Sequence, residues 1–230
     1  MYNVPVSQIV CKSNHAIFDT RSMIRCCLLV LLCCSIAVPA TAGRYNKVLS
    51  VGDQAPAWKD LPGVDDQQHS LADLADKRAI LVVFTCNTCP YANDAESRVI
   101  ALHEEYESRG VAVVAISVNK NPEDLLPAMK EHAKDREYKF PYLHDESQQI
   151  AKDFGAKYTP EFYVLDQQRR IVYMGALDDS LLGSEVKQPY VELAIEAALN
   201  EGKPEVAETA PVGCAVQYER IRRRRRKSRN

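Results

Sequence analysis

The apolar positions of this chain fall into short continuous runs separated by longer stretches with helical spacing. Residues 79–84 and 111–118 are apolar runs rich in valine, isoleucine and alanine. Such runs are typical of strands buried on both faces of a sheet. Two further runs, 162–165 and 171–174, are separated by five polar residues. That pattern predicts a β-hairpin.

Helical spacing fills the intervals between these runs. A first helix is predicted from about residue 89 to residue 108, with Gly110 as its stop. A second helix is predicted to begin at Pro122, because proline is favoured in the first helical turn. A short third helix ends at Gly155, and a last helix covers about residues 189–199.

The order of the predicted elements is strand, helix, strand, helix, hairpin, helix. Alternating strands and helices give a layered α/β fold, and the hairpin adds an antiparallel edge to it. We therefore expect a central mixed sheet flanked by helices. The expected division of the chain is an N-terminal signal peptide or anchor at 1–42, the domain at 43–203, and a polar tail at 204–230.

The N-terminal segment has the layout of an export signal. Arg21 and Arg25 precede an apolar run at 26–38, and the small residues at 40–42 supply an A-x-A arrangement. The run is shorter than the roughly 20 residues that a membrane span needs. A cleaved signal peptide is the first interpretation; an uncleaved anchor and a lipid anchor on a cysteine of the run are the others. Each of them predicts an extracytoplasmic protein, in the periplasm or its equivalent.

The charge of the chain is unevenly distributed. The formal net charge of the 230 residues is −2, but residues 43–219 carry more acidic than basic side chains, and most of residues 220–230 are arginine. An acidic body argues against nucleic acid as the main ligand, since such binding needs a basic face. The basic end is interpreted as a solvated terminus or as a segment with weak attraction to anionic lipid headgroups.

The cysteines point to redox chemistry. Of the eight cysteines, only Cys86, Cys89 and Cys214 lie beyond residue 42. Three cysteines are too few for a fold held together by disulfides. The C-x-x-C pair Cys86 and Cys89 is therefore predicted to be chemical.

The position of the pair favours thiol–disulfide exchange. It lies where a buried strand is predicted to meet a helix, so both residues would face one way in the first turn, with Cβ atoms roughly 5–6 Å apart. A helix N-terminus stabilises a thiolate. We expect Cys86, as the first and more exposed cysteine, to attack the partner's disulfide, and Cys89 to resolve the mixed disulfide.

Three motifs together carry a family resemblance. They are V-G-x-x-A-P near residue 51, the C-x-x-C after a buried strand, and Thr159-Pro160 before a later strand. With them the chain resembles the thioredoxin-like superfamily and, within it, the redoxin (AhpC/TSA) branch, which includes exported thiol–disulfide oxidoreductases. The resemblance implies a thioredoxin-like fold over about residues 50–200. It also implies a cis Pro160 against the disulfide, and backbone groups of Thr159 that are offered to an incoming peptide.

The sequence departs from the family pattern around the pair. Asn87 and Thr88 separate the cysteines, Thr85 replaces the usual tryptophan, and the preceding apolar strand lacks the buried carboxylate of thioredoxin. Glu161, next to Pro160, is the candidate for a base in its place.

The resulting hypothesis is an extracytoplasmic thiol–disulfide oxidoreductase that needs no cofactor and no metal. Its expected partners are protein thiols and disulfides and an upstream electron donor. A peroxiredoxin-like thiol peroxidase is the first alternative, although Ala79 and Val83 occupy the positions where that class has proline and a hydroxyl residue. A non-catalytic thioredoxin-fold binding domain is the second.

Two questions about the cysteines remain open: whether the pair binds zinc, and what Cys214 does. A zinc site normally uses four ligands, and beyond the pair the chain offers only Cys214 and scattered histidines. Cys214 itself is either a free thiol on a loose tail or a third redox cysteine. Some redoxins that the chain resembles carry a similar Gly-Cys tail.

Overall fold

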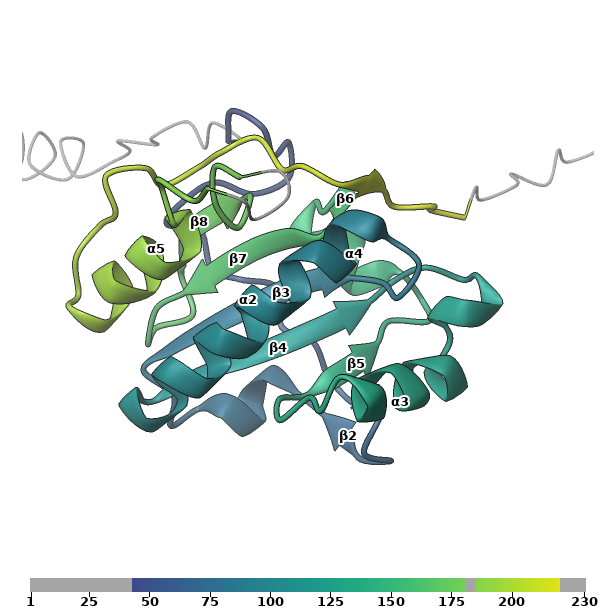
Figure 1. Cartoon of the computed structure of the whole chain (residues 1–230). Helices are drawn as coiled ribbons and strands as arrows, with labels where there is room; N and C mark the ends of the chain where they lie inside the picture. Colours follow the sequence, from purple (N-terminus) through teal and green to yellow (C-terminus); the bar gives the residue numbers. More distant parts are fainter. Residues whose placement is uncertain (1–42, 181–184, 220–230) are drawn as a thin grey trace, which may run out of the picture. The chain divides into compact units, whose positions relative to one another are not determined.

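The computed structural model describes residues 43–180 and 185–219 and contains the expected mixed sheet (Figure 1). Its strand order is β5-β4-β3-β7-β8, with β3, β4 and β5 parallel to one another and β7 and β8 antiparallel to their neighbours. The strands are β3 (Ala79–Thr85), β4 (Val111–Ser117), β5 (Tyr142–His144), β7 (Glu161–Leu165) and β8 (Ile171–Gly175).

Helices and short two-residue ladders complete the described part of the chain. The α-helices are α2 (Pro90–Tyr106), α3 (Leu126–Asp135), α4 (Gln149–Phe154) and α5 (Tyr190–Leu199). The 3-10 helices are η1 (Leu71–Leu74), η2 (Glu107–Arg109) and η3 (Pro122–Asp124). β1 (Leu61–Pro62) pairs with β2 (Gln68–His69), and β6 (Tyr158–Thr159) pairs with β9 (Cys214–Ala215).

The helix predicted from Pro122 is interrupted. Leu125 adopts an extended conformation between η3 and α3, and α3 then begins with Pro127 in its first turn. In an unbroken helix Pro127 would lack its N–H bond and its ring would clash with the carbonyl of Glu123. Restarting the helix at Leu126 places Pro127 where a missing N–H costs nothing.

The sheet separates two apolar layers. Alternate residues of β3 point to opposite faces, as expected for a strand. Leu81 and Val83 pack with residues of α2, α3 and α5 on one face. Val82 and Phe84 pack with Trp58 and with residues of α4 on the other. The sheet is thus covered on both sides, which explains why β3 and β4 read as unbroken apolar runs.

The chain does not leave the domain at residue 203, where the sequence placed its end. The backbone of Met174 in β8 exchanges hydrogen bonds with Ala207 and Thr209 at 3.2 and 3.1 Å. Further on, Val216 joins the apolar layer around Phe84. The sequence did not predict these contacts, because the segment is polar and hydrogen bonds between backbone atoms leave no pattern in the residue types.

The predictions for residues 1–42 and 220–230 concern segments outside the described residues and stay predictions. Within 43–180 and 185–219, no helix combines the length and the hydropathy needed to cross a membrane.

Candidate active site

Cys86 and Cys89 occupy different positions from those expected. Cys86 directly follows β3, and Cys89 is the N-cap of α2, with Pro90 as the first helical residue. The prediction that both lie in the first helical turn is wrong for Cys86. Both side chains are only 2% exposed, so Cys86 is not the more accessible of the two.

Thr159 contacts both thiols. The Cys89 thiol donates a hydrogen bond to the Thr159 carbonyl at 2.8 Å, and Cys86 Sγ lies 3.4 Å from Thr159 Oγ1. The Thr159–Pro160 peptide bond is cis, as the family resemblance implied. The structure therefore brings Thr159 to the cysteine pair, although the two segments are some 70 residues apart in the chain.

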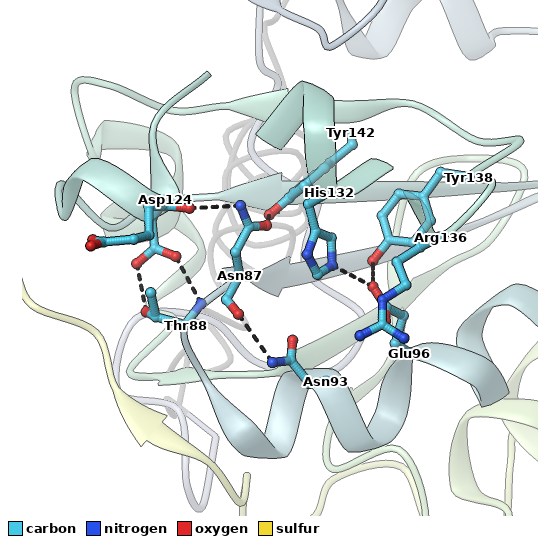
Figure 2. Close-up of polar contacts among 10 residues, drawn as sticks. Asn87, Thr88, Asn93, Glu96, Asp124, His132, Arg136, Tyr138 and Tyr142 are labelled. Carbon is cyan, nitrogen blue, oxygen red and sulfur yellow. Dashed lines mark hydrogen bonds and ion pairs between the residues drawn. The ribbon is translucent and has the colours of Figure 1, made fainter. Parts of the chain in front are cut away.

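The loop between the cysteines is held by a buried carboxylate (Figure 2). Thr88 donates from its backbone N–H to Asp124 Oδ1 at 2.9 Å and from its hydroxyl to Oδ2 at 2.8 Å. Asp124 is fully buried. Asn87 donates to the Glu123 carbonyl at 2.7 Å and accepts from the Tyr142 hydroxyl at 2.8 Å. Asn87 and Thr88 therefore fix the loop rather than supply charge to it.

Sequence reasoning missed Asp124. It lies in η3, a single turn after β4, and belongs to no motif. The apolar strand β3 does lack a carboxylate, as expected, but Asp124 brings one to the cysteine loop from another element. The preceding residue, Glu123, is also acidic, so nothing in the local sequence distinguished Asp124.

The surroundings of the two thiols differ in their effect on ionisation. A hydrogen bond between the two thiols has the largest effect on the pKa of each cysteine, because only one of the two sulfurs holds the shared proton. Burial opposes ionisation of both. The Cys89 thiol also donates to the Thr159 carbonyl, which a thiolate could not do. Cys86 Sγ faces the Thr159 hydroxyl instead, a contact that lowers the pKa of Cys86, so the geometry favours Cys86 as the thiolate of the pair.

Cys214 lies against the pair and not on a loose tail. It is in β9, in register with Thr159 of β6. It also packs on the small cluster of Cys86, Cys89 and Ala92. Unlike the other two cysteines, it is partly exposed.

Glu161 is engaged elsewhere. Its carboxylate accepts hydrogen bonds from the backbone N–H groups of Lys157 and Tyr158 at 2.7 and 3.1 Å, and from the Tyr163 hydroxyl at 2.9 Å. Burial raises its pKa, and these hydrogen bonds partly offset the effect. None of the hydrogen bonds found in the described residues joins Glu161 to a cysteine, so the geometry does not support it as the base for the pair.

No group of three or more His, Cys, Asp or Glu in the described residues is arranged to hold a metal ion. The reactive groups that these residues bring together are three thiols, a hydroxyl and a carbonyl.

Proteins similar to this chain include relatives named as thiol-disulfide oxidoreductases and a solved structure described as a hypothetical protein. The chain is 25% identical over 162 residues to thiol-disulfide oxidoreductase ResA of Bacillus thuringiensis, covering 66% of this chain and 86% of the relative. A hypothetical protein from Sinorhizobium meliloti has a solved structure that is similar to this chain, with 31% identity and a TM-score of 0.72. The match covers 76% of this chain and 98% of that one.

A thioredoxin-family thiol:disulfide interchange protein from Chlorobium tepidum confirms the fold. Its TM-score is 0.52 at 22% identity, and the match covers 66% of this chain and 99% of that one. The ResA relatives confirm the class expected from the sequence, a thiol–disulfide oxidoreductase.

One family model covers more than half of the chain. It is the model of the AhpC/TSA family, and it matches residues 51–174. This range runs from the V-G-x-x-A-P entry motif, through both cysteines of the pair and Thr159-Pro160, to the end of the hairpin. The chain belongs to the AhpC/TSA family.

Proposed function

We propose that this protein is an extracytoplasmic oxidoreductase that exchanges the Cys86–Cys89 dithiol or disulfide with protein thiols and disulfides. The observation that carries the proposal is the placement of both thiols on Thr159, beside a cis proline and at the N-terminus of α2. The relatives named as thiol-disulfide oxidoreductases support it. The export-signal pattern of residues 1–42 supports the location.

In this proposal Cys86 is the attacking thiolate and Cys89 the resolving thiol, the order expected from the sequence. The Cys89 thiol donates to the Thr159 carbonyl, so it holds its proton in the reduced protein. Cys86 Sγ lies 3.4 Å from the Thr159 hydroxyl, a contact that favours a thiolate on Cys86.

The exchange then has two steps. The Cys86 thiolate attacks one sulfur of a partner disulfide, forms a mixed disulfide, and releases the other partner sulfur as a thiolate. Cys89 then loses its proton to the released partner thiolate and attacks Cys86 Sγ, which forms the Cys86–Cys89 disulfide and releases the second partner sulfur as a thiolate. The partner gains two electrons and one proton from the enzyme, and its second sulfur takes a proton from water.

Thr159 is the docking point for the partner's main chain in this proposal. The Thr159 carbonyl already accepts a hydrogen bond from the Cys89 thiol. Thr159 belongs to β6, a strand that pairs with β9. An extended peptide that pairs with Thr159 would bring its own cysteine toward Cys86, whose Sγ lies 3.4 Å from Thr159 Oγ1. Such strand addition gives affinity through main-chain hydrogen bonds and is tolerant of sequence.

The test is reduction of a protein disulfide, with insulin as substrate and dithiothreitol as electron source. We expect turnover by the wild type and none by Cys86→Ser. Cys89→Ser should accumulate a mixed disulfide with the substrate, because it can attack but not resolve. The proposal fails if Cys86→Ser turns over insulin as fast as the wild type, or if only peroxide and no disulfide is consumed.

The redox potential of the pair decides the direction of the exchange. Related enzymes span roughly −270 mV for reductants to −120 mV for oxidants. Equilibration of the wild type in glutathione buffers, followed by alkylation, gives the value. If the pair does not titrate as a two-electron couple, the interpretation as a non-catalytic binding domain replaces the proposal.

A further inference from the structure

The C-terminal strand β9 occupies the main chain that the proposed function offers to a partner. Cys214 is in register with Thr159, and the Val216 N–H donates to the Lys157 carbonyl at 2.8 Å, which extends the pairing. In Figure 1 this yellow-green segment runs beside β6. The protein therefore carries a tethered strand at the edge where a substrate peptide would pair.

The approach of this strand to the cis-proline segment requires a glycine. A Cβ atom on Gly213 would lie 2.1 Å from the Thr159 carbonyl oxygen and 2.6 Å from its carbon. Both distances are far below van der Waals contact, and backbone atoms cannot rotate away as a flexible side chain can. Gly213 thus allows Cys214 to reach the pair.

Buried side chains hold the strand in place. Gln148 is fully buried and donates from Nε2 to the carbonyls of Val118 and Gln217 at 2.8 and 3.0 Å. Its Oε1 accepts from the Glu219 N–H at 2.8 Å. These hydrogen bonds join Gln148 to Val118 and to the segment at 217–219. Displacing that segment would leave the buried amide without its partners, which costs free energy. The position of β9 is therefore built into the fold.

The three thiols differ in access. Cys86 and Cys89 are each 2% exposed, whereas Cys214 is partly exposed and in hydrogen-bond contact with Cys89. Cys89 is thus the central sulfur, with Cys86 and Cys214 as its two thiol neighbours. A reductant in solution meets Cys214 before it meets the buried pair.

We propose that Cys214 is a third redox cysteine that converts the buried Cys86–Cys89 disulfide into a Cys89–Cys214 disulfide. This inference rests on the proposed function, since it needs the Cys86–Cys89 disulfide as its starting point. The Cys214 sulfur attacks Cys89 Sγ, the Cys89–Cys214 bond forms, and the Cys86–Cys89 bond breaks. Cys86 leaves as a thiolate and takes up the proton that Cys214 loses. One disulfide replaces another, so no oxidant or reductant is consumed.

The oxidation state of Cys89 favours this step. In the reduced protein, burial and then the interactions with Cys89 raise the pKa of Cys214 to about 11. Once Cys89 is in a disulfide it carries no negative charge, so this contribution to the raised pKa disappears. Cys214 becomes easier to deprotonate when there is a disulfide for it to attack.

The exchange would transfer the disulfide from a buried site to the partly exposed β9. There a dithiol donor can reduce it by attacking Cys214, which regenerates the three thiols and oxidises the donor. The chemical class of partner that this site takes is therefore a protein or small-molecule dithiol.

The test is disulfide mapping of the purified full chain. The protein is oxidised with oxidised glutathione, quenched with acid, alkylated, and digested for non-reducing mass spectrometry. We expect both Cys86–Cys89 and Cys89–Cys214 in the wild type, Cys89–Cys214 in Cys86→Ser, and no intramolecular disulfide of Cys214 in Cys89→Ser. The inference is overturned if the wild type contains only Cys86–Cys89 and if Cys86→Ser keeps Cys89 and Cys214 as free thiols.

Two glycine substitutions, one at a close contact with Thr159 and one away from it, test whether the position of β9 is needed. Gly213→Ala should lower the fraction of Cys89–Cys214 by roughly tenfold, the ratio that corresponds to about 1.4 kcal/mol. Gly202→Ala should leave the fraction unchanged, because a Cβ there meets only one carbonyl oxygen, at 3.6 Å. Equal effects of the two substitutions would contradict the role of β9.

The outcomes separate this inference from the proposed function. If the wild type reduces insulin and forms Cys86–Cys89 but never Cys89–Cys214, only the inference on Cys214 fails. If it forms no Cys86–Cys89 disulfide and does not reduce insulin, the proposed function itself fails.

Discussion

Cys89 combines a helix N-terminus with contacts to two neighbouring thiols. The i, i+3 spacing predicted the proximity of Cys86 and Cys89. The predicted start of the helix at about residue 89 is confirmed, since Cys89 is the N-cap of α2 and Cys86 directly follows β3. The contact of Cys214 with the pair could not be predicted in this way, because it depends on the pairing of two segments far apart in the chain.

A titration of the reduced protein tests which cysteine is the thiolate. Because the hydrogen bond between the two thiols stabilises a single thiolate, the pair should lose its first proton below the ordinary cysteine pKa of 9.0. The ultraviolet absorbance of thiolates measures this. Cys86→Ser should remove the low-pH thiolate, and Cys89→Ser should keep it but move its pKa upward, since the hydrogen bond between the thiols is lost. A low-pH thiolate that survives in Cys86→Ser would assign it to Cys89.

The Thr88–Asp124 contact supports a prediction about stability. Thr88→Val removes the hydroxyl that donates to Asp124 Oδ2 and leaves that buried oxygen with only Asn121 at 3.2 Å. The expected loss in the free energy of unfolding is about 1–3 kcal/mol, the range for removing one hydrogen bond to a buried carboxylate.

Urea denaturation of the reduced protein measures that loss. Thr88→Ser is the matched control, because serine keeps the hydroxyl and should stay within about 0.5 kcal/mol of the wild type. If the two variants were equally stable, the hydroxyl would not be what anchors the loop.

At the level of elements, α2 and α3 are joined by an ionic cluster on Glu96 (Figure 2). His132 Nε2 lies 2.6 Å from Glu96 Oε1, the Tyr138 hydroxyl donates to the same oxygen, and Arg136 Nε lies 3.2 Å from Oε2. Burial opposes ionisation of Glu96, but these partners outweigh it and lower its pKa. His132 of α3 therefore pairs with Glu96 of α2 and helps to hold the two helices together.

The lowered pKa of Glu96 predicts a pH dependence of stability. A carboxyl with a lower pKa in the folded state stabilises that state above its unfolded pKa, here 4.5, and the contribution is lost as pH falls through the folded value. Glu96→Gln should cost about 1–3 kcal/mol at neutral pH, and the difference should shrink below pH 4.5. Denaturation curves over pH measure this, with the exposed Glu104→Gln as control. A difference that stays constant with pH would assign the loss to packing alone.

The sequence predicted those elements whose local pattern agrees with their tertiary setting. The apolar runs of β3 and β4 and the hairpin of β7 and β8 were predicted because buried strands need continuous apolar residues. β5 was missed because it is three residues long, and β9 because it is two residues in a polar segment. Their positions depend on backbone pairing with distant strands, which leaves no local pattern.

At the level of the whole molecule, the C-terminal segment closes the active site. Its most deeply buried apolar side chain is Val216, which is 8% exposed within the layer that contains Phe84 and Phe154, and Tyr218 packs against the same layer. Val216 follows Cys214 by two residues. Because side chains in a strand alternate between faces, both can point inward from β9. The segment that packs on the thiols is thus anchored in the core of the domain.

This anchoring predicts that Val216→Ala opens the site without touching any thiol. Removing its buried methyl groups should destabilise the seated strand by about 1–2 kcal/mol. Local opening depends exponentially on that free energy, so the open population should rise by roughly tenfold. The reaction of Cys89 with an aromatic disulfide reagent should then accelerate by a similar factor, because the reagent reaches Cys89 only when β9 has left.

Val206→Ala is the matched control, since it makes the same change in the same segment at a side chain that is 40% exposed. Stopped-flow measurement of the reagent's leaving group gives the two rates. If both variants react like the wild type, β9 does not limit access to Cys89, and partners must reach the pair by another face. If Val216→Ala alone reacts faster, and insulin reduction accelerates with it, then a partner peptide and β9 compete for the same strand edge on Thr159. Displacement of β9 would then be the step that admits a protein substrate.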